Sequence, residues 1–159
     1  MYFVVKVIMK LLVGLGNPGA KYLKNRHNVG HMFIDFLASQ ELLLRSWKSD
    51  VFMNESGVFV KKYLTNLTNL YIVHDDLDLK LGTYKIQFGV GPKVHNGIKN
   101  IEEVLGTKDF WRIRIGVDNR SPANGRETGE RYVLEDFADG ELKILKGVYA
   151  KIRDDLGKY

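Results

Sequence analysis

The chain contains no cysteine among its 159 residues. Without cysteine it can form no disulfide and offers no thiol to a metal ion. This composition fits the reducing interior of a cell, and we therefore expect a cytoplasmic protein.

A long uninterrupted apolar run is also missing. The apolar start, residues 1–12, is broken by Lys6 and Lys10, which come too soon for a membrane helix or the apolar core of a signal peptide. We interpret this start as a buried strand and expect no membrane contact. The chain has no internal repeat, low-complexity tract or linker, so residues 1–159 are predicted to form a single domain.

The charge balance is modestly basic. Lys and Arg number 24 and Asp and Glu 19, which gives a formal net charge of +5. Such an excess is compatible with a partner that carries phosphates, but it identifies none by itself.

Apolar periodicity predicts strands and helices that interleave along the chain. Strands are expected at residues 4–15, 70–73, 84–88 and 111–117. Helices are expected from about His31 into the 40s, after Gly57, over 98–105 with Gly106 as C-cap, and over 142–152. This order predicts an α/β fold with a central mixed, twisted sheet covered by helices.

The segment Gly14-Leu-Gly-Asn-Pro-Gly19 follows the first strand and matches the glycine pattern of dinucleotide-binding loops. Such a loop must open a helix whose N-terminus faces the pyrophosphate. Here residues 20–27 have no clear apolar face, and Asp35, near the expected acidic position, lies inside a predicted helix. We therefore interpret the glycines as a turn at the carboxyl edge of the sheet.

Polar clusters fall where predicted strands end or turns begin. They contain Asn17, His27-Asn28, His74-Asp75-Asp76, Asn54 and Asn96. Sites in open α/β sheets form at this edge, so an imidazole, a carboxylate and several amides could converge there. Such a set can hydrolyse an ester: the imidazole takes a proton from water, the carboxylate fixes its tautomer, and amides stabilise the oxyanion. The alternative, that each Asn caps a turn and each His lies on the surface, stays open for any single residue.

A metal site is not expected. His27 and His31 are four residues apart, which could place two ligands on one helix face, but no third ligand is evident. Residues 75–78 lack the glycine and distal glutamate of a calcium loop. We predict no metal and no cofactor.

Five motifs, taken together, resemble the bacterial-type peptidyl-tRNA hydrolase family. They are KLLVGLGNPGAKY at 10–22 with NRHNVG at 25–30, FMNESG at 52–57, VHDDLDL at 73–79 with Gly82, HNGIKNI at 95–101, and LG at 105–106 with FWRIRIG at 110–116. The resemblance runs in family order from about Lys10 to Phe137. It implies an enzyme that hydrolyses the ester between a peptide and the 3′ end of tRNA, acting as a monomer.

The resemblance also implies a role for each matching residue. His27 would be the general base, Asp75 the carboxylate that orients it, and Asn17 a group beside the scissile ester. The other implied contacts are with substrate. Phe52, Met53, Asn54 and Asn96 would line the groove for the peptide main chain or the 3′ end, Tyr22 would contact the tRNA end, and Lys85 and Arg114 would bind tRNA phosphate.

The chain departs from the family pattern in four places, one of which is at its ends, where the C-terminal tail is short and the family's start matches Met9-Lys10 rather than Met1. Pro92, Lys93 and Val94 replace flexible residues before His95, and Gln87 stands where a second basic residue is common. A segment is missing after Trp47, which implies a reduced sheet edge. These departures leave open a weakened, hydrolase-like RNA-binding protein. The joint presence of the proposed base, its carboxylate and the site amides favours an enzyme.

Overall fold

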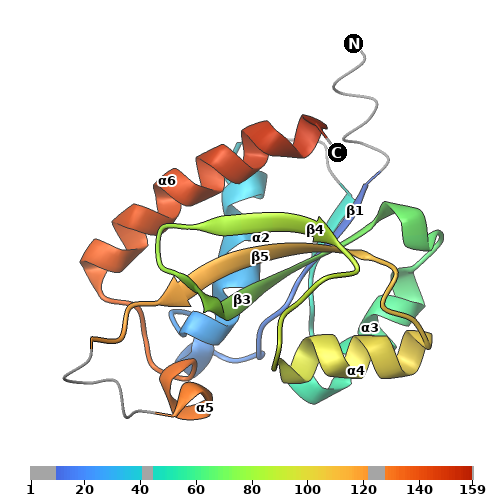
Figure 1. Cartoon of the computed structure of the whole chain (residues 1–159), viewed down its shortest axis with the longest axis horizontal. Helices are drawn as coiled ribbons and strands as arrows, with labels where there is room; N and C mark the ends of the chain where they lie inside the picture. The colour runs from blue at the N-terminus through green and yellow to red at the C-terminus, as the bar shows by residue number, and fades with distance from the viewer. Residues whose placement is uncertain (1–9, 41–44, 122–127, 159) are drawn as a thin grey trace.

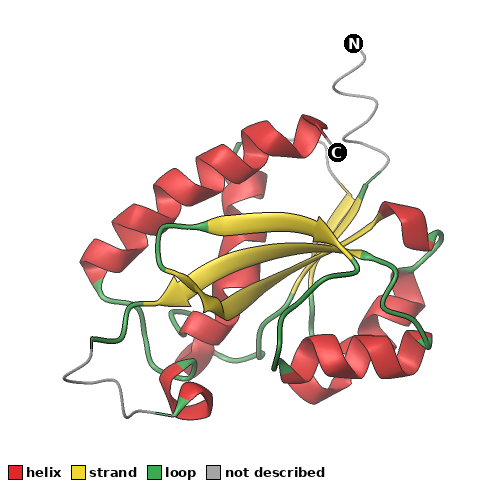
Figure 2. Cartoon of the chain, viewed as in Figure 1, coloured by secondary structure: helices red, strands yellow, loops and turns green. Residues whose placement is uncertain are grey.

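The computed structural model describes residues 10–40, 45–121 and 128–158. Its helices and strands alternate along most of the chain (Figures 1 and 2). They are β1 (Leu11–Gly14), α2 (Val29–Ser39), β2 (Arg45–Lys48), α3 (Ser56–Tyr63), β3 (Leu70–Lys80), β4 (Tyr84–Phe88), α4 (Asn96–Leu105), β5 (Trp111–Asp118), α5 (Gly129–Tyr132) and α6 (Asp139–Asp155). The α/β class predicted from the sequence is confirmed.

The five strands form one mixed sheet in the order β2-β1-β3-β5-β4. The first four are parallel, and β4 runs antiparallel to β5 at the other edge. Because the parallel strands share a direction, the segments that follow β1 and β2 and the second half of β3 lie at one end of the sheet.

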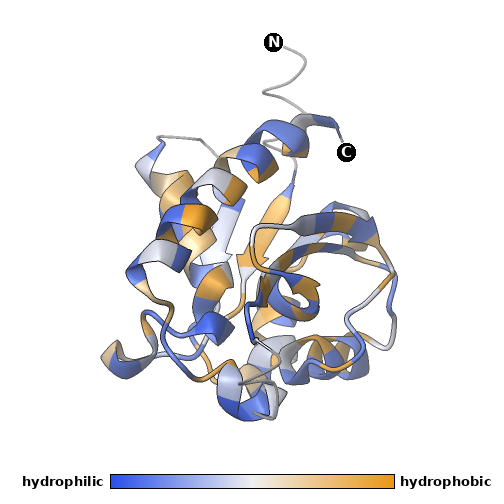
Figure 3. Ribbon diagram, turned by 60° about the vertical axis from the view of Figure 1, so that its left-hand side comes forward, coloured by the Kyte–Doolittle hydropathy of each residue, from blue (hydrophilic) through white to orange (hydrophobic). Residues whose placement is uncertain are grey.

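Helices cover both faces of the sheet (Figure 2). On one face α2 and α6 pack on alternate strand residues such as Leu12, Val73 and Ile113. On the other face α3 and α4 pack on the intervening residues, among them Val13 and Ile72. In Figure 3 hydrophobic β1 lies inside, while hydrophilic and hydrophobic residues alternate along α6. This is the pattern of a helix with one buried face.

Most predicted elements are confirmed, with shifted ends. The first strand covers Leu11–Gly14, whereas residues 4–9 of its predicted range lie outside the described residues. The second helix, predicted after Gly57, ends at Tyr63, and Leu67 begins a separate 3₁₀ turn, Leu67–Asn69. Gly106 has a φ of 69° and ends α4, as predicted.

Three features differ from the prediction. β3 continues to Lys80, so His74, Asp75 and Asp76 lie within the strand and not after it, because pairing with β5 continues to Gly116. The edge strand β2 and the short helix α5 were not predicted, since neither has enough apolar residues to show a period. No described helix is long and apolar enough to cross a membrane.

Candidate active site

A cleft of about 1180 Å³ opens at the carboxyl end of the parallel strands. Its walls come from the loops after β1 and β2, from β3, from the segment before α4, and from α5 with the residues after it. The lining includes Asn17, His27, Phe52, Met53, Asn54, Asp75, Asp76, Val94, His95, Asn96, Val133 and Leu134. Residues that are up to 117 positions apart in the sequence therefore face one space.

Asn17 is held on both its main chain and its side chain. Its backbone N–H donates to Asn28 Oδ1, and its carbonyl accepts from Asn28 Nδ2, both at 2.9 Å. Its side-chain Oδ1 accepts from the backbone N–H of Met53 at 2.9 Å. Because that N–H can only donate, the amide orientation of Asn17 is fixed with Nδ2 as the remaining donor. Among the described residues nothing accepts from Nδ2, which is left for a ligand in the cleft.

His27 lies in the 3₁₀ turn Arg26–Asn28 that leads into α2. Its backbone N–H donates to the carbonyl of Val133 at 2.8 Å, which ties this turn to the C-terminal segment. Close contact between two glycines brings the start of α2 onto the sheet. A Cβ at Gly14 would lie 2.3 Å from the carbonyl oxygen of Gly30, and a Cβ at Gly30 would lie 2.4 Å from that of Val73. Only glycine allows this approach, which places His27 beside β3.

Asp75 joins two histidines. His27 Nδ1 lies 2.9 Å from both carboxylate oxygens, and His95 Nε2 lies 2.8 Å from Oδ1. Asp75 is 2% exposed. Burial would raise its pKa, but the two histidines and their hydrogen bonds outweigh burial and hold the pKa of Asp75 far below its usual range. The carboxylate therefore stays ionised.

The same contact determines the state of His27. Burial disfavours the imidazolium, but the charge of Asp75 and its hydrogen bond outweigh this, so the pKa of His27 is raised above 6.5. Since an ionised Asp75 can only accept, His27 carries a proton on Nδ1 when neutral. Its Nε2 is then unprotonated and available in the cleft, as a general base requires.

His95 was not among the predicted site residues. It is the N-cap of α4, and its Nδ1 accepts from the backbone N–H groups of Gly97 and Ile98 at 3.1 and 3.2 Å. Its proton must therefore lie on Nε2, from which it donates to Asp75. In the sequence, His95 stands directly before Asn96-Gly97, close to the start of a predicted helix, where N-cap residues are found. Histidine is not a usual N-cap, so this signal was weak.

The other two histidines are poor candidates for the base. His74 is fully buried, and burial, followed by the nearby His95, lowers its pKa to about 3. His31 lies outside the cleft lining, and burial, followed by Lys48, lowers its pKa to about 4. Both are neutral at physiological pH.

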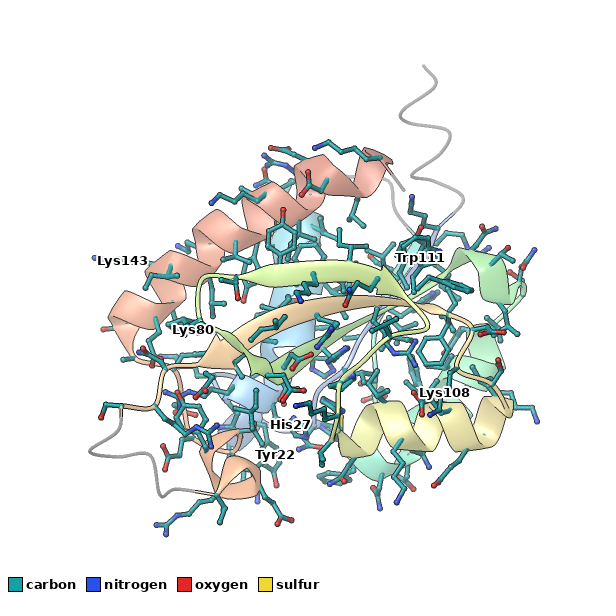
Figure 4. The ribbon with its side chains drawn as sticks, in the orientation of Figure 1. Tyr22, His27, Lys80, Lys108, Trp111 and Lys143 are labelled. Carbon is teal, nitrogen blue, oxygen red and sulfur yellow. The ribbon has the colours of Figure 1, made fainter. Side chains whose placement is uncertain are left out.

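The predicted groove residues lie at the cleft. Phe52, Asn54 and Asn96 are exposed lining residues, whereas Met53 is 6% exposed and contributes its backbone N–H to Asn17. Tyr22 does not line the cleft but packs edge-on against Phe52, with ring centroids 6.4 Å apart, and lies near His27 in Figure 4.

The two predicted phosphate ligands are placed differently. Lys85 is exposed on β4, outside the cleft lining. Arg114 is 7% exposed, its Nε donates to Asp76 Oδ2 at 2.7 Å, and its Nη1 donates to Gln87 Oε1 at 2.6 Å. Gly91 packs so closely that a Cβ there would lie 2.6 Å from the guanidinium carbon. Two of the Arg114 nitrogens are therefore held by protein partners, whereas no described group accepts from its Nη2, so the phosphate role of Arg114 stays a prediction.

The facing atoms of His27, Asp75 and His95 lie within 4.8 Å of one another, a spacing that a metal ion could also use. Two ligands at about 2.0–2.1 Å from a tetrahedral Zn²⁺ would be roughly 3.3–3.4 Å apart. The observed N···O separations of 2.8 and 2.9 Å are those of direct hydrogen bonds. The trio therefore fits shared protons better than a shared metal ion.

This arrangement has the parts needed for hydrolysis by water. It combines a base with a fixed tautomer, a buried carboxylate that stabilises the imidazolium, and an amide donor whose orientation is set. A neutral imidazole held by a carboxylate can take a proton from water, so water is the attacking group that this arrangement supports best.

Comparison with known proteins gives consistent matches. The family model described as Peptidyl-tRNA hydrolase matches in two overlapping segments, residues 11–50 and 42–158. The peptidyl-tRNA hydrolase of Aliarcobacter butzleri (strain RM4018) is 39% identical, over 88% of this chain and 86% of that protein. That of Lawsonia intracellularis (strain PHE/MN1-00) is 36% identical, over 94% and 86%. The crystal structure of peptidyl-tRNA hydrolase from Acinetobacter baumannii has a TM-score of 0.78 and 28% identity, covering 94% of this chain and 87% of that one.

Proposed function

The chain belongs to the peptidyl-tRNA hydrolase family and is an enzyme of that class, and from this premise we propose how its residues cut the ester between a peptide and the 3′ end of tRNA. The observation that carries the proposal is the placement of two groups in one cleft: the free Nε2 of His27, held by Asp75, and the free Nδ2 of Asn17.

His27 acts as the general base. Its Nε2 takes a proton from a water molecule, which attacks the ester carbonyl, while Nδ1–H donates to Asp75 throughout. Asp75 stabilises the imidazolium that forms and does not itself take the proton. His95 supports Asp75 from the other side with a second hydrogen bond.

Asn17 stabilises the charge on the carbonyl oxygen. Its Nδ2 donates to the ester oxygen as the tetrahedral intermediate develops, and one such donor is worth on the order of 10²–10³-fold in rate. The intermediate then collapses, His27 returns its proton to the 3′ oxygen, and the products are a peptide with a free carboxylate and an intact tRNA.

The remaining cleft residues hold the substrate on its common features. Asn54 and Asn96 hydrogen-bond the peptide main chain or the 3′ nucleotide, while Phe52 and Met53 form the apolar floor. Main-chain recognition accepts any peptide sequence, and Asn17 beside the ester favours an N-blocked over a free aminoacyl group. Tyr22 contacts the tRNA end, and Lys85 attracts its phosphates.

The decisive experiment incubates the protein with an N-blocked aminoacyl-tRNA and measures release of the blocked amino acid, with unblocked aminoacyl-tRNA as the matched substrate. We expect release of the blocked form alone. His27→Ala should lower the rate by about 10²–10⁴-fold, with tRNA affinity and the fold retained. A variant that keeps more than a tenth of the activity would remove His27 as the base. Binding of tRNA without hydrolysis by the unchanged protein would favour the RNA-binding alternative.

The cytoplasmic location, the monomeric state and the independence from metal and cofactor remain predictions from the sequence. The first two are checked by fractionation and light scattering. The last is checked by activity after dialysis against a chelator, which should be unchanged.

A further inference from the structure

The turn that carries His27 is paired with the segment that forms one wall of the cleft. Residues 24–27 run antiparallel to residues 133–137, and backbone hydrogen bonds join them, among them one of 2.8 Å from the N–H of His27 to the carbonyl of Val133. Five residues of the segment 128–134, called here the α5 wall, line the cleft: Thr128, Gly129, Glu130, Val133 and Leu134. The base and one wall of the cleft therefore belong to one hydrogen-bonded unit.

Arg26, the residue before His27, is buried inside this unit. It is 7% exposed, and its guanidinium carbon lies 4.1 Å from the centre of the Tyr132 ring in α5. Its Nη1 donates to the carbonyl of Asp136 at 3.0 Å, and its Nη2 donates to Glu141 Oε1 at 2.9 Å. One side chain therefore contacts α5, the segment after it and the first turn of α6.

The groups that hold Arg26 are themselves anchored on the core of the fold. Glu141 lies in α6, and its Oε2 accepts from Asn119 Nδ2 at 3.2 Å. The Tyr132 hydroxyl accepts from the backbone N–H of Asn119 at 3.0 Å and donates to the carbonyl of Val117 at 3.3 Å. The position of the guanidinium is therefore set by α6 and by the end of β5, neither of which lies in the turn of the base.

This anchor bears on the reaction because His27 is held by its ring on one side and by its backbone on the other. The hydrogen bond from Nδ1 to Asp75 holds the ring, while the backbone of the turn sets how far Nε2 reaches into the cleft. A misplacement of about 1 Å can lower the rate of an enzyme by about 10²-fold. The separation between the base and the opposite wall is therefore a quantity on which catalysis depends.

We propose that Arg26 is a positioning residue, which fixes the separation between His27 and the α5 wall and so sets the base at the distance at which it meets the substrate. The proposal rests on the proposed function, whose base it positions. Arg26 does not line the cleft, so it acts through its neighbour His27 and through Tyr132, and not on the substrate.

The test removes both charges of the buried pair, in a variant that carries Arg26→Gln and Glu141→Gln. No unpaired charge is then left in the interior, so this variant should fold. The shorter amide lacks a planar cation to lie on Tyr132 and cannot contact Asp136 and the side chain at position 141 together, so the anchor is lost.

A similar pair between β5 and α4 provides the matched control. Arg112 is 1% exposed, its Nη2 lies 2.6 Å from Glu102 Oε1, and its guanidinium carbon lies 4.1 Å from the centre of the Phe110 ring. The control variant carries Arg112→Gln and Glu102→Gln. It removes an equally buried arginine and its partner, but neither residue contacts the turn of His27.

In the test variant kcat for an N-blocked aminoacyl-tRNA should fall by about 10–10²-fold, and KM should rise several-fold because the α5 wall is loosened. The acid limb of the pH–rate profile should move to lower pH, since a looser contact with Asp75 raises the pKa of His27 less. The titratable groups that face His27 are Asp75 and His95, and neither is changed. The control should leave kcat and the acid limb in place.

NMR titration of the His27 ring in the free protein gives a second readout that needs no reaction. Its midpoint should move to lower pH in the test variant and stay in place in the control. A wild-type kcat and a wild-type His27 titration in the test variant would overturn the proposal. Equal changes in the control would also overturn it, because loss of any buried pair would then have this effect.

A third variant keeps the test valid if the double substitution does not fold. Arg26→Lys keeps a charge opposite Glu141 but has no planar group to lie on Tyr132. It should shift kcat and the His27 titration in the same direction by less, and wild-type values for both would overturn the proposal. The proposed function fails separately, if the unsubstituted protein does not release a blocked amino acid from tRNA.

Discussion

Asp75 controls the protonation of two histidines at once. It accepts from Nδ1 of His27 and from Nε2 of His95, and the backbone of α4 occupies the other nitrogen of His95. The position of each proton in this trio is therefore fixed, because the carboxylate of Asp75 only accepts and the backbone N–H groups of α4 only donate. Catalysis should therefore respond more strongly to replacement of Asp75 than to small changes in its distance from either histidine.

Replacing Asp75 with Asn should reverse the tautomer of His27. The amide Oδ1 would accept from His95, so Nδ2 would face His27 Nδ1 and force the proton onto Nε2, where the base is needed. We expect kcat to fall by about 10²–10⁴-fold. Since Asp75 raises the pKa of His27, its loss should also move the acid limb of the pH–rate profile to lower pH. Asp35→Asn, an exposed carboxylate on α2, is the control and should leave the profile unchanged.

An acid limb that stays in place in Asp75→Asn would show that the ionisation of His27 does not limit the rate. The role of Asp75 would then be limited to packing. Protein stability must be measured in parallel, because an unfolded variant would lose activity at every pH alike.

Arg114 forms a buried ion pair with Asp76, so we expect it to contribute to the stability of the fold. Removing one partner of a buried ion pair leaves the other charge without compensation, so Arg114→Ala should lower the free energy of unfolding by about 3–5 kcal/mol. Arg153→Ala, which breaks a more exposed pair with Asp154, should cost less than about 1 kcal/mol. Urea unfolding measures both. Normal stability in Arg114→Ala, with a salt slope for tRNA flatter by about one, would favour its predicted role as a phosphate ligand over a structural one.

At the scale of elements, the loop after β1 depends on the residue that follows β2. Ser49 is 1% exposed, and its Oγ accepts from the backbone N–H of Gly16 at 3.2 Å. The same hydroxyl lies 3.2 Å from His31 Nε2. The edge strand therefore supports the loop that presents Asn17, one position beyond Gly16.

Ser49→Ala should loosen that loop. The N–H of Gly16 would lose its partner in a buried setting, at a cost of about 1–3 kcal/mol, and Asn17 would be held less firmly. We expect a lower free energy of unfolding together with a several-fold lower kcat. Ser46→Ala, within β2 itself, should change stability by less than about 0.5 kcal/mol. Loss of stability with kcat intact would mean that Met53 and Asn28 alone position Asn17.

At the scale of the whole molecule, two neutral histidines, one buried and one partly buried, should make the fold sensitive to acid. The pKa is lowered to about 4 for His31 and to about 3 for His74, both from an ordinary value of 6.5. Below pH 6.5 the unfolded chain binds protons that the folded chain does not, so stability falls as pH drops from 6.5 toward 4. Asp75, whose pKa is depressed, adds a further loss below its ordinary pKa of 3.8. His27 acts in the opposite sense, because its raised pKa gives stability that is present below pH 6.5 and lost as pH rises through the folded value.

Two such histidines should give a slope of up to about 2.7 kcal/mol per pH unit between pH 6 and 4. His31→Gln should reduce this slope by about 1.4 kcal/mol per unit, because one proton fewer is taken up on unfolding. Urea unfolding at several pH values measures the slope. The difference in free energy of unfolding between the two proteins at pH 8 gives the cost of the substitution that is unrelated to titration. Parallel curves for the two proteins would mean that His31 titrates normally in the folded state.

The sequence alone determined the order of the elements and the identity of the central residues. Apolar periodicity is a local property, so neighbouring residues by themselves indicated β1, α2, β4, α4 and α6. The motif around His27 and Asp75 named two residues that the fold brings into hydrogen-bond contact. The elements and these two residues could be predicted because the residues that indicate them are neighbours in the chain.

The tertiary structure decided what depends on residues far apart in the sequence. The alternation of apolar and polar residues in β5 could not predict whether the Arg114 side chain is exposed. Gly91, which packs against it, belongs to a loop, and Asp76, with which Arg114 pairs, belongs to another strand. The role of His95 was equally hidden, since it follows from the meeting of the α4 N-terminus with Asp75. The burial of a side chain and the position of its proton depend on such long-range contacts, so they could not be predicted from neighbouring residues alone.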